Sequence, residues 1–160
     1  MKLIYAFIDS LKLPKKEAMK RVNKLNMKTT IIYLFFLLII WALPIIIELL
    51  ALKDNNDIPR DIYIIQVLIV YPFLMVFLAL VTITIVSFFG TLVSKAVKRK
   101  LKFQLLWKMS VFALTLPTLV YTLMYIIIGS NSFVNGGVLI LFAFTLVRMI
   151  LHYPKQIPTR

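Results

Sequence analysis

The sequence predicts an all-α, polytopic membrane protein with four transmembrane helices, preceded by one or two amphipathic helices at the membrane interface. The 160 residues are 61% hydrophobic, with a mean hydropathy of +0.93, well above the roughly 45–50% apolar content of soluble domains. The chain also contains four long apolar runs, each of a length that suits a hydrocarbon core of about 30 Å. A lopsided distribution of charge completes the evidence for this fold class.

The charges are biased towards one sign and towards one side of the predicted membrane. The chain holds 19 Lys and Arg against 6 Asp and Glu, and all but two of these cations fall within residues 2–28, 95–108 and 148–160. Because Lys and Arg resist translocation, we expect these segments and both termini in the cytoplasm. The cations are then expected to meet anionic headgroups, and nucleic acid is not an expected partner.

Residues 1–28 are predicted to form a basic segment at the membrane interface. Pro14 suits the first position of a second helix, in which Glu17 and Arg21 are spaced for an i,i+4 ion pair. A signal peptide is the alternative, but the basic region is long and no small-residue cleavage pattern follows the apolar run. The apolar residues at helical spacing are Leu3, Ile4, Phe7, Ile8 and Leu11 in the first helix, and Ala18, Met19, Val22 and Leu25 in the second.

Residues 29–153 are predicted to form the membrane domain, and residues 154–160 a cytoplasmic tail. The second span lies in a run of 33 uncharged residues, about 50 Å as one helix. A tilt, an interfacial start or a bend near Pro72 is expected to absorb the excess. Pro117 is expected to bend the third span. The predicted spans are about 29–51, 65–93, 109–128 and 134–152, and a turn is predicted at GSNSFVNGG, residues 129–137.

Small and hydroxyl-bearing residues recur at helical steps on the second and third spans. Such stripes let membrane helices approach closely and exchange hydrogen bonds, so we expect them to pack the two spans against each other. A polar path that also uses Gln66 is the alternative. The predicted packing residues are Thr84, Ser87, Gly90, Thr91, Thr115, Thr118 and Thr122.

Reactive constellations are not evident in the sequence, so we expect neither an enzyme nor a bound cofactor or metal. The chain has no cysteine, and His152 is its one histidine, placed beside Tyr153 at the end of the last span. There is no GxSxG motif and no acid at the middle of a span. Calcium was considered for the acids of the first loop, but their spacing matches no EF-hand, and a solvated turn is preferred. Those acids are Glu48, Asp54, Asp57 and Asp61.

The basic block before the third span is the predicted docking surface. A short cluster of cations beside aromatic residues is typical of segments that bind anionic lipid or an acidic cytoplasmic partner, with Phe103 and Trp107 anchored at the headgroups. The alternative is that these cations only set the topology. The predicted docking residues are Lys95, Lys98, Arg99, Lys100, Lys102, Phe103, Trp107 and Lys108.

Three segments resemble a known bacterial family, that of domain of unknown function 1189. The stretch KRKLKFQLLWKMSVFALTLPTLVYTL, residues 98–123, is similar to the family's basic loop that leads into a helix. FIDSLKLPKKEAMKR, followed by a span that ends in ALP, resembles the family's opening over residues 7–44. YPFLMVFLAL, in the second span, also resembles the family.

The resemblance implies a multi-spanning protein of a bacterial cell (inner) membrane, related to the wider Yip-type group, in which some relatives are labelled maltodextrin-utilisation proteins. Most members carry a substantial extracytoplasmic segment between the first two spans, where this chain has only residues 48–61. The family supplies no catalytic residues to carry over. Together with the residues, it favours a non-catalytic scaffold, assembly factor or regulator of a membrane complex, acting on a membrane-protein partner or by self-association. The alternative is an accessory subunit or small carrier in carbohydrate transport.

Overall fold

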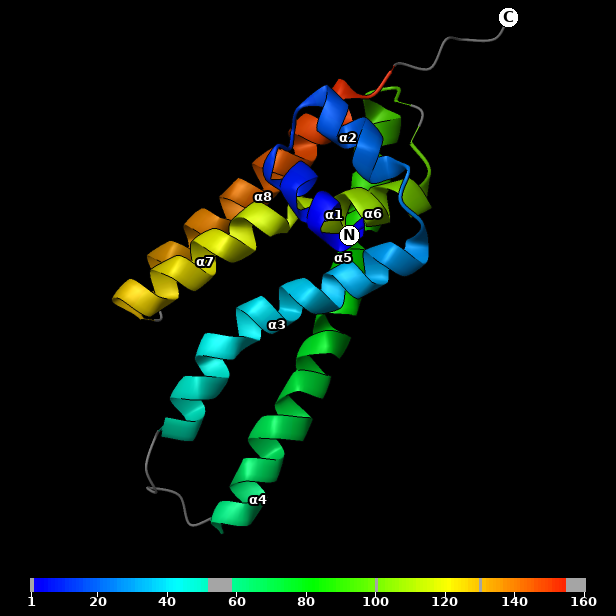
Figure 1. Cartoon of the computed structure of the whole chain (residues 1–160). Helices are drawn as coiled ribbons and strands as arrows, with labels where there is room; N and C mark the ends of the chain where they lie inside the picture. Colours follow the sequence, from blue (N-terminus) through cyan, green and yellow to red (C-terminus); the bar gives the residue numbers. More distant parts are fainter. Residues whose placement is uncertain (1, 52–58, 100, 130, 155–160) are drawn as a thin grey trace, which may run out of the picture.

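The computed structural model describes residues 2–51, 59–99, 101–129 and 131–154, which form helices and no strand (Figure 1). The chain is 87% helical, and four of the described segments are long and apolar enough to cross a membrane, which confirms the predicted all-α fold class. The elements are α1 (Lys2–Leu11), α2 (Lys16–Asn23), α3 (Met27–Ala51), α4 (Arg60–Ile65), the π-helical turn η1 (Gln66–Val70), α5 (Tyr71–Ala96), α6 (Phe103–Ala113), α7 (Thr115–Ile128) and α8 (Ser132–His152).

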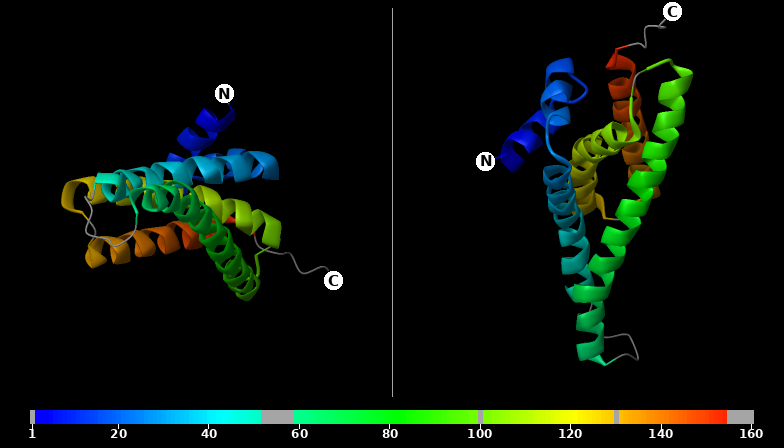
Figure 2. Two further views of the ribbon diagram at one scale, coloured as in Figure 1. Left: turned by 90° about the horizontal axis from the view of Figure 1, so that it is seen from below. Right: turned by 90° about the vertical axis from the view of Figure 1, so that its right-hand side faces the viewer.

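Helix α6 is the centre of the fold. In the right-hand view of Figure 2, α3 and α5 separate towards the end that carries α2, and α6 lies between them. It contacts α2, α3, α5, α7 and α8. Leu106, Met109, Val111 and Phe112 are each fully buried there. The core therefore sits at one end of the four-span bundle, where the two amphipathic helices cover it.

The second span is one continuous helical segment, Arg60–Ala96, of 37 residues. At 1.5 Å per residue it is about 56 Å long, more than a bilayer of about 30 Å requires. Just before Pro72 the helix contains the π-helical turn η1, and the N–H of Tyr71 donates to the carbonyl of Gln66. The wider π turn accommodates the ring of Pro72, which clashes with an ordinary α-helical carbonyl four residues earlier.

The third span is broken into α6 and α7 at Leu114. Pro117 has no N–H to donate to the carbonyl of Ala113, and the N–H of Leu114 is shared between the carbonyls of Ser110, at 3.2 Å, and Val111, at 3.3 Å. The expected bend is thus present. The helix begins at Phe103, six residues before the predicted start. The predicted span contains no charge and therefore begins after Lys108, whereas α6 includes this residue.

The fourth span begins earlier than the predicted turn allows. Gly129, at φ 77°, ends α7, and Asn131 then caps α8: its side chain accepts a hydrogen bond from the N–H of Phe133 at 3.0 Å. The prediction of a turn through residue 137 was therefore wrong. The cap at Asn131 starts the helix at Ser132. Gly136 and Gly137, which suggested a loop, therefore lie within α8.

Helices α1 and α2 fold back on the core, and an ion pair joins them. Arg21 of α2 pairs with Asp9 of α1, with two Nε–Oδ distances of 2.9 and 3.0 Å, rather than with Glu17 as predicted. The carboxylate raises the pKa of Arg21 through this hydrogen bond and its charge. The predicted second apolar face is buried as Ala18, Met19 and Val22. In α1, Ala6 and Ser10 are buried, whereas Ile4 and Ile8 are exposed.

Candidate docking surface at the basic end

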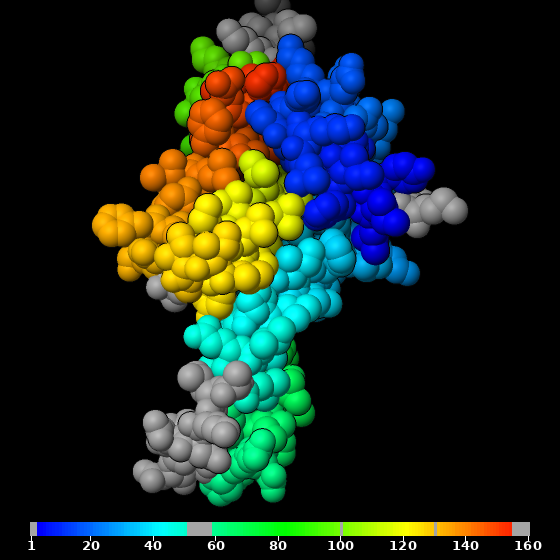
Figure 3. Space-filling model, turned by 60° about the vertical axis from the view of Figure 1, so that its left-hand side comes forward, coloured from blue at the N-terminus to red at the C-terminus, as the bar shows by residue number. Residues whose placement is uncertain are grey.

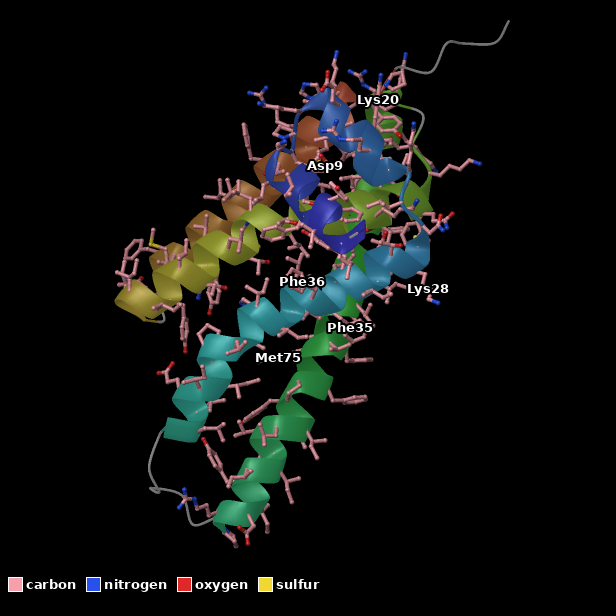
Figure 4. The ribbon with its side chains drawn as sticks, in the orientation of Figure 1. Asp9, Lys20, Lys28, Phe35, Phe36 and Met75 are labelled. Atoms are coloured by element: carbon pink, nitrogen blue, oxygen red, sulfur yellow. The ribbon has the colours of Figure 1, made fainter. Side chains whose placement is uncertain are left out.

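The cations gather at one end of the molecule, which we call the basic end. It comprises α1, α2, the turn between α5 and α6, and the last turn of α8, and Figure 4 shows nitrogen-bearing side chains around α2 at this end, Lys20 among them. Exposed cations on the two amphipathic helices and the segment after them are Lys12, Lys15, Lys16, Lys20, Arg21, Lys24 and Lys28. These side chains form a broad positive rim around the buried core.

The predicted basic block contributes a smaller exposed group, which we call the basic patch: Lys95, Lys98, Lys102 and Phe103. All four side chains are exposed, and Phe103 is 43% exposed. An aromatic ring beside three ammonium groups suits a headgroup surface or an acidic partner. Lys100, which was predicted to belong to the same surface, lies outside the described residues.

A tight turn holds the basic patch. The N–H of Arg99 donates to the carbonyl of Ser94 at 2.8 Å, and the N–H of Lys98 donates to the carbonyl of Lys95 at 3.0 Å. This is the Schellman pattern at the end of α5, with Lys98 in the left-handed position at φ 54°. The hydroxyl of Ser94 also donates to the carbonyl of Arg99 at 3.2 Å. The turn fixes the backbone from which the patch lysines project.

Two of the predicted docking cations instead bind backbone carbonyls. The ammonium of Lys108 donates to the carbonyl of Leu25 at 2.7 Å and to that of Asn23 at 3.3 Å, at the end of α2. The guanidinium of Arg99 donates to the carbonyl of Tyr153 beyond the end of α8. A cation at a helix C-terminus is stabilised by the helix dipole. Arg99 and Lys108 therefore tie together elements that are far apart in sequence.

Asn23 and Tyr153 complete this junction, and the sequence analysis missed both. The side-chain amide of Asn23 donates to the hydroxyl of Tyr153 at 3.3 Å. Burial raises the pKa of Tyr153, and the amide opposes the shift. Beside Tyr153 is a pocket of about 380 Å³, lined by Lys102, Gln104, Leu105, Lys108 and Tyr153. Two polar atoms of the residues that bond to Tyr153, Asn23 Oδ1 and Arg99 Nε, are buried without a hydrogen-bond partner among the described residues.

Trp107 lies in the core and not on the basic patch. Only 8% of it is exposed, and it belongs to the buried cluster that α6 forms with α2, α3 and α8. Its neighbour on the sequence, Leu106, is fully buried as well. The aromatic position of the patch therefore falls to Phe103 alone, since the face of α6 that holds Trp107 turns towards the interior.

The polar stripe on the second span does pack against the next helix. Ser87, Gly90 and Ser94 are buried on one face of α5, and the hydroxyl of Ser87 lies 3.3 Å from that of Ser110 on α6. A Cβ built on Gly90 would lie 3.4 Å from Leu106 Cδ2. Gly90 thus permits the close approach of α6. The hydroxyls of Ser87, Thr84 and Thr91 all donate to carbonyls of their own helix, and Thr84 is exposed.

The threonines of the third span face a different partner from the one expected. Thr115 is buried, and its hydroxyl donates to the carbonyl of Phe112 at 2.8 Å while it accepts from the hydroxyl of Tyr33, on α3, at 2.7 Å. Thr118 and Thr122 are partly buried on α7, which packs against α3 and α8. The second and third spans are therefore paired through α5 and Ser110 of α6. The threonines of the third span lie on α7, where Thr115 bonds to α3.

Other chemistry-bearing residues are separate from one another. Among the described residues, no three His, Cys, Asp or Glu side chains are close enough to hold a metal ion. Two of the acids weighed for calcium, Asp54 and Asp57, lie outside those residues. The Nδ1 of His152 donates to the carbonyl of Arg148 within α8 at 2.7 Å.

Comparison with known proteins places the chain in a family. No curated protein and no solved structure matches it. The model of the family described as "Protein of unknown function (DUF1189)" matches residues 51–152, which include the basic patch, α6 and the three later spans. Residues 7–44, which also resemble this family, lie outside the match. Because the match covers more than half of the 160 residues, the chain belongs to the DUF1189 family.

Proposed function

We propose that this protein is a non-catalytic scaffold, assembly factor or regulator of a membrane complex, with its basic end in the cytoplasm of a bacterial cell. The observation that carries the proposal is the division of the cations at that end. Arg99 and Lys108 bind backbone carbonyls, while Lys95 and Lys98, in the hydrogen-bonded turn at the end of α5, and Lys102, directly before α6, are exposed. A positive surface on a fixed backbone suits recognition, because little conformational freedom is lost when a partner binds.

A second feature supports lateral contact with another membrane protein. Within an apolar stretch of 18 residues in the second span, only 6% is buried, whereas 22–28% is buried in the corresponding stretches of the other three spans. Figure 3 shows α3 and α4 extending beyond the α7–α8 hairpin, so few neighbours cover this part of the molecule. Phe73 is 75% exposed and Ile69 64% exposed. A partner helix can pack along this surface, where association depends on van der Waals contact rather than on hydrophobic burial.

The proposal places no reaction in this chain. Its expected partners are a bilayer with anionic headgroups and an acidic cytoplasmic surface of another membrane protein. Each exposed lysine near such a surface contributes about 1 kcal/mol of attraction, so the three lysines of the basic patch together supply a meaningful share of a weak docking energy.

The test is purification of the full chain from cells in a mild detergent, with the bound proteins identified by mass spectrometry. We expect a discrete partner with the wild type and its loss when Lys95, Lys98 and Lys102 are all changed to Gln. Changing Lys12, Lys15 and Lys16 to Gln is the matched control, because it removes the same charge from the connection between α1 and α2 and the first residue of α2. The partner should remain with this control variant.

Two results would count against the proposal. One is a wild type that brings down no specific protein, and the other is a partner that binds the patch variant as well as the wild type. A fall in maltodextrin uptake in a deletion strain, restored equally by the wild type and the patch variant, would favour the transport role instead.

A further inference from the structure

A second pocket lies between α3 and α7, towards the end of the molecule opposite the basic end. It has a volume of about 520 Å³, and its wall is almost entirely apolar, with Ile40, Leu43, Ile47 and Ile126 among its lining residues. Leu43, Ile47 and Ile126 are each more than half exposed, so the pocket opens sideways as a groove. Helices α3 and α7, the two walls, lie side by side in Figure 3.

A carboxylate stands at one end of this groove. Glu48 lines it, and its Oε2 accepts a hydrogen bond from the hydroxyl of Tyr125, which lines the opposite wall. The ring centroids of Tyr125 and Tyr121 are 5.7 Å apart, and those of Tyr121 and Trp41 are 6.0 Å apart. A carboxylate beside electron-rich aromatic faces is a favourable place for a cation and an unfavourable one for an anion.

Two further features lie in the walls of the groove. Pro44, in the wall, has no N–H to donate to the carbonyl of Ile40, so α3 lacks one backbone hydrogen bond there, although it remains helical on both sides. Thr122, on the facing wall, has a buried hydroxyl oxygen without a hydrogen-bond partner among the described residues.

We propose that this groove binds one phospholipid whose headgroup carries an ammonium, as in phosphatidylethanolamine, with the ammonium at Glu48 and an acyl chain along Ile47, Leu43 and Ile40. From Glu48 to Ile40 the helix rises about 12 Å, most of the roughly 15 Å of hydrocarbon in one leaflet. The groove thus matches an acyl chain in length and chemistry, and the carboxylate favours a zwitterionic headgroup that offers an ammonium over an anionic headgroup that lacks one. This site is distinct from the basic patch and does not depend on the proposed function.

The experiment is photolabelling of the full chain in nanodiscs made of equal parts phosphatidylethanolamine and phosphatidylglycerol. Each lipid is supplied in turn as a probe with a photoreactive group on the same acyl chain, and labelled peptides are identified by mass spectrometry. We expect the phosphatidylethanolamine probe to label the peptides of Leu43 and Ile126 about fivefold more than the phosphatidylglycerol probe. Glu48→Gln should abolish this preference, because glutamine still accepts from Tyr125 but has no charge.

Two further variants separate the groove from the general lipid surface. Leu43→Trp fills the groove and should remove labelling of Ile126 by both probes. Leu139→Trp is the control, on an α8 side chain that is 67% exposed and outside the groove, and it should leave the labelling unchanged. Equal labelling by the two lipids, a preference that survives Glu48→Gln, or crosslinks from the groove to a second copy of the chain would each overturn the proposal.

Discussion

The ammonium of Lys108 on α6 donates to the carbonyl of Leu25 at 2.7 Å, across 83 residues of sequence. This contact fixes the segment after α2 against the central helix of the fold. It also separates Lys108 from the exposed lysines of the basic patch, with which it shares a stretch of sequence. One basic block therefore serves two purposes, since some of its cations hold the basic end together and others face outwards.

The first prediction concerns that contact. Lys108→Met should lower the free energy of unfolding by about 1.5–3 kcal/mol, because it removes a charged donor from two carbonyls in a partly buried site. The measurement is thermal unfolding of the purified protein in detergent. Lys102→Met is the control and should change stability by less than about 0.5 kcal/mol, since Lys102 is exposed. Equal effects of the two variants would contradict the division between structural and exposed cations.

The second prediction tests the close approach of α5 and α6. Gly90→Leu should destabilise the protein by about 1–3 kcal/mol, because even a Cβ at Gly90 already lies in contact with Leu106 and a larger side chain forces the helices apart. Gly136→Leu on α8 is the matched control, with open space around its Cα, and should be tolerated. Unfolding in detergent reports both variants. A tolerated Gly90→Leu would show that the two helices do not need this close approach.

The third prediction concerns the hydroxyl pair Tyr33 and Thr115. In a double-mutant cycle of Tyr33→Phe and Thr115→Val, the coupling free energy should be about 0.6 kcal/mol, the average for hydrogen bonds between membrane helices. Pairing Tyr33→Phe with Thr84→Val should give no coupling, because the Thr84 hydroxyl bonds within its own helix. A Tyr33–Thr115 coupling indistinguishable from zero would remove this bond from the account of α3 and α7 packing.

The fourth prediction addresses topology. The chain has no cysteine, so single-cysteine variants need no altered background. With the basic end in the cytoplasm, Lys20→Cys should react with a membrane-impermeant maleimide only after the inner membrane is opened, and Asp61→Cys should react in intact spheroplasts. Both positions are exposed. The reverse pattern of labelling would invert the proposed orientation.

The all-α class could be predicted from sequence because the length of an uncharged run and the effect of a proline both depend on neighbouring residues in the chain. The break near Pro117 and the disturbance near Pro72 follow from what a proline does to its own helix. The start of α6 could not be predicted this way, since the contact that stabilises the charge of Lys108 within the third span, the carbonyl of Leu25, is distant in sequence.

The candidate site was predicted only in part, for a related reason. The basic block was evident from its cations, but which of them bind the protein itself depends on contacts between distant residues. Asn23 and Tyr153 are 130 residues apart and meet only in the fold. The burial of Trp107 could not be predicted either, because the helices packed around α6 decide which of its side chains are buried. For α1, an apolar periodicity could not distinguish a face against the core from a face against lipid.

The central claim, that the basic patch docks a partner, is tested most directly by crosslinking in intact cells. A photoreactive residue replaces Phe103, which is exposed beside the patch lysines, and the products are identified by mass spectrometry. Placing the same residue at Leu139 is the control for random contacts in the bilayer. We expect a discrete protein adduct from position 103 that disappears when Lys95, Lys98 and Lys102 are changed to Gln. Lipid adducts alone, or a protein adduct that survives these changes, would contradict the claim.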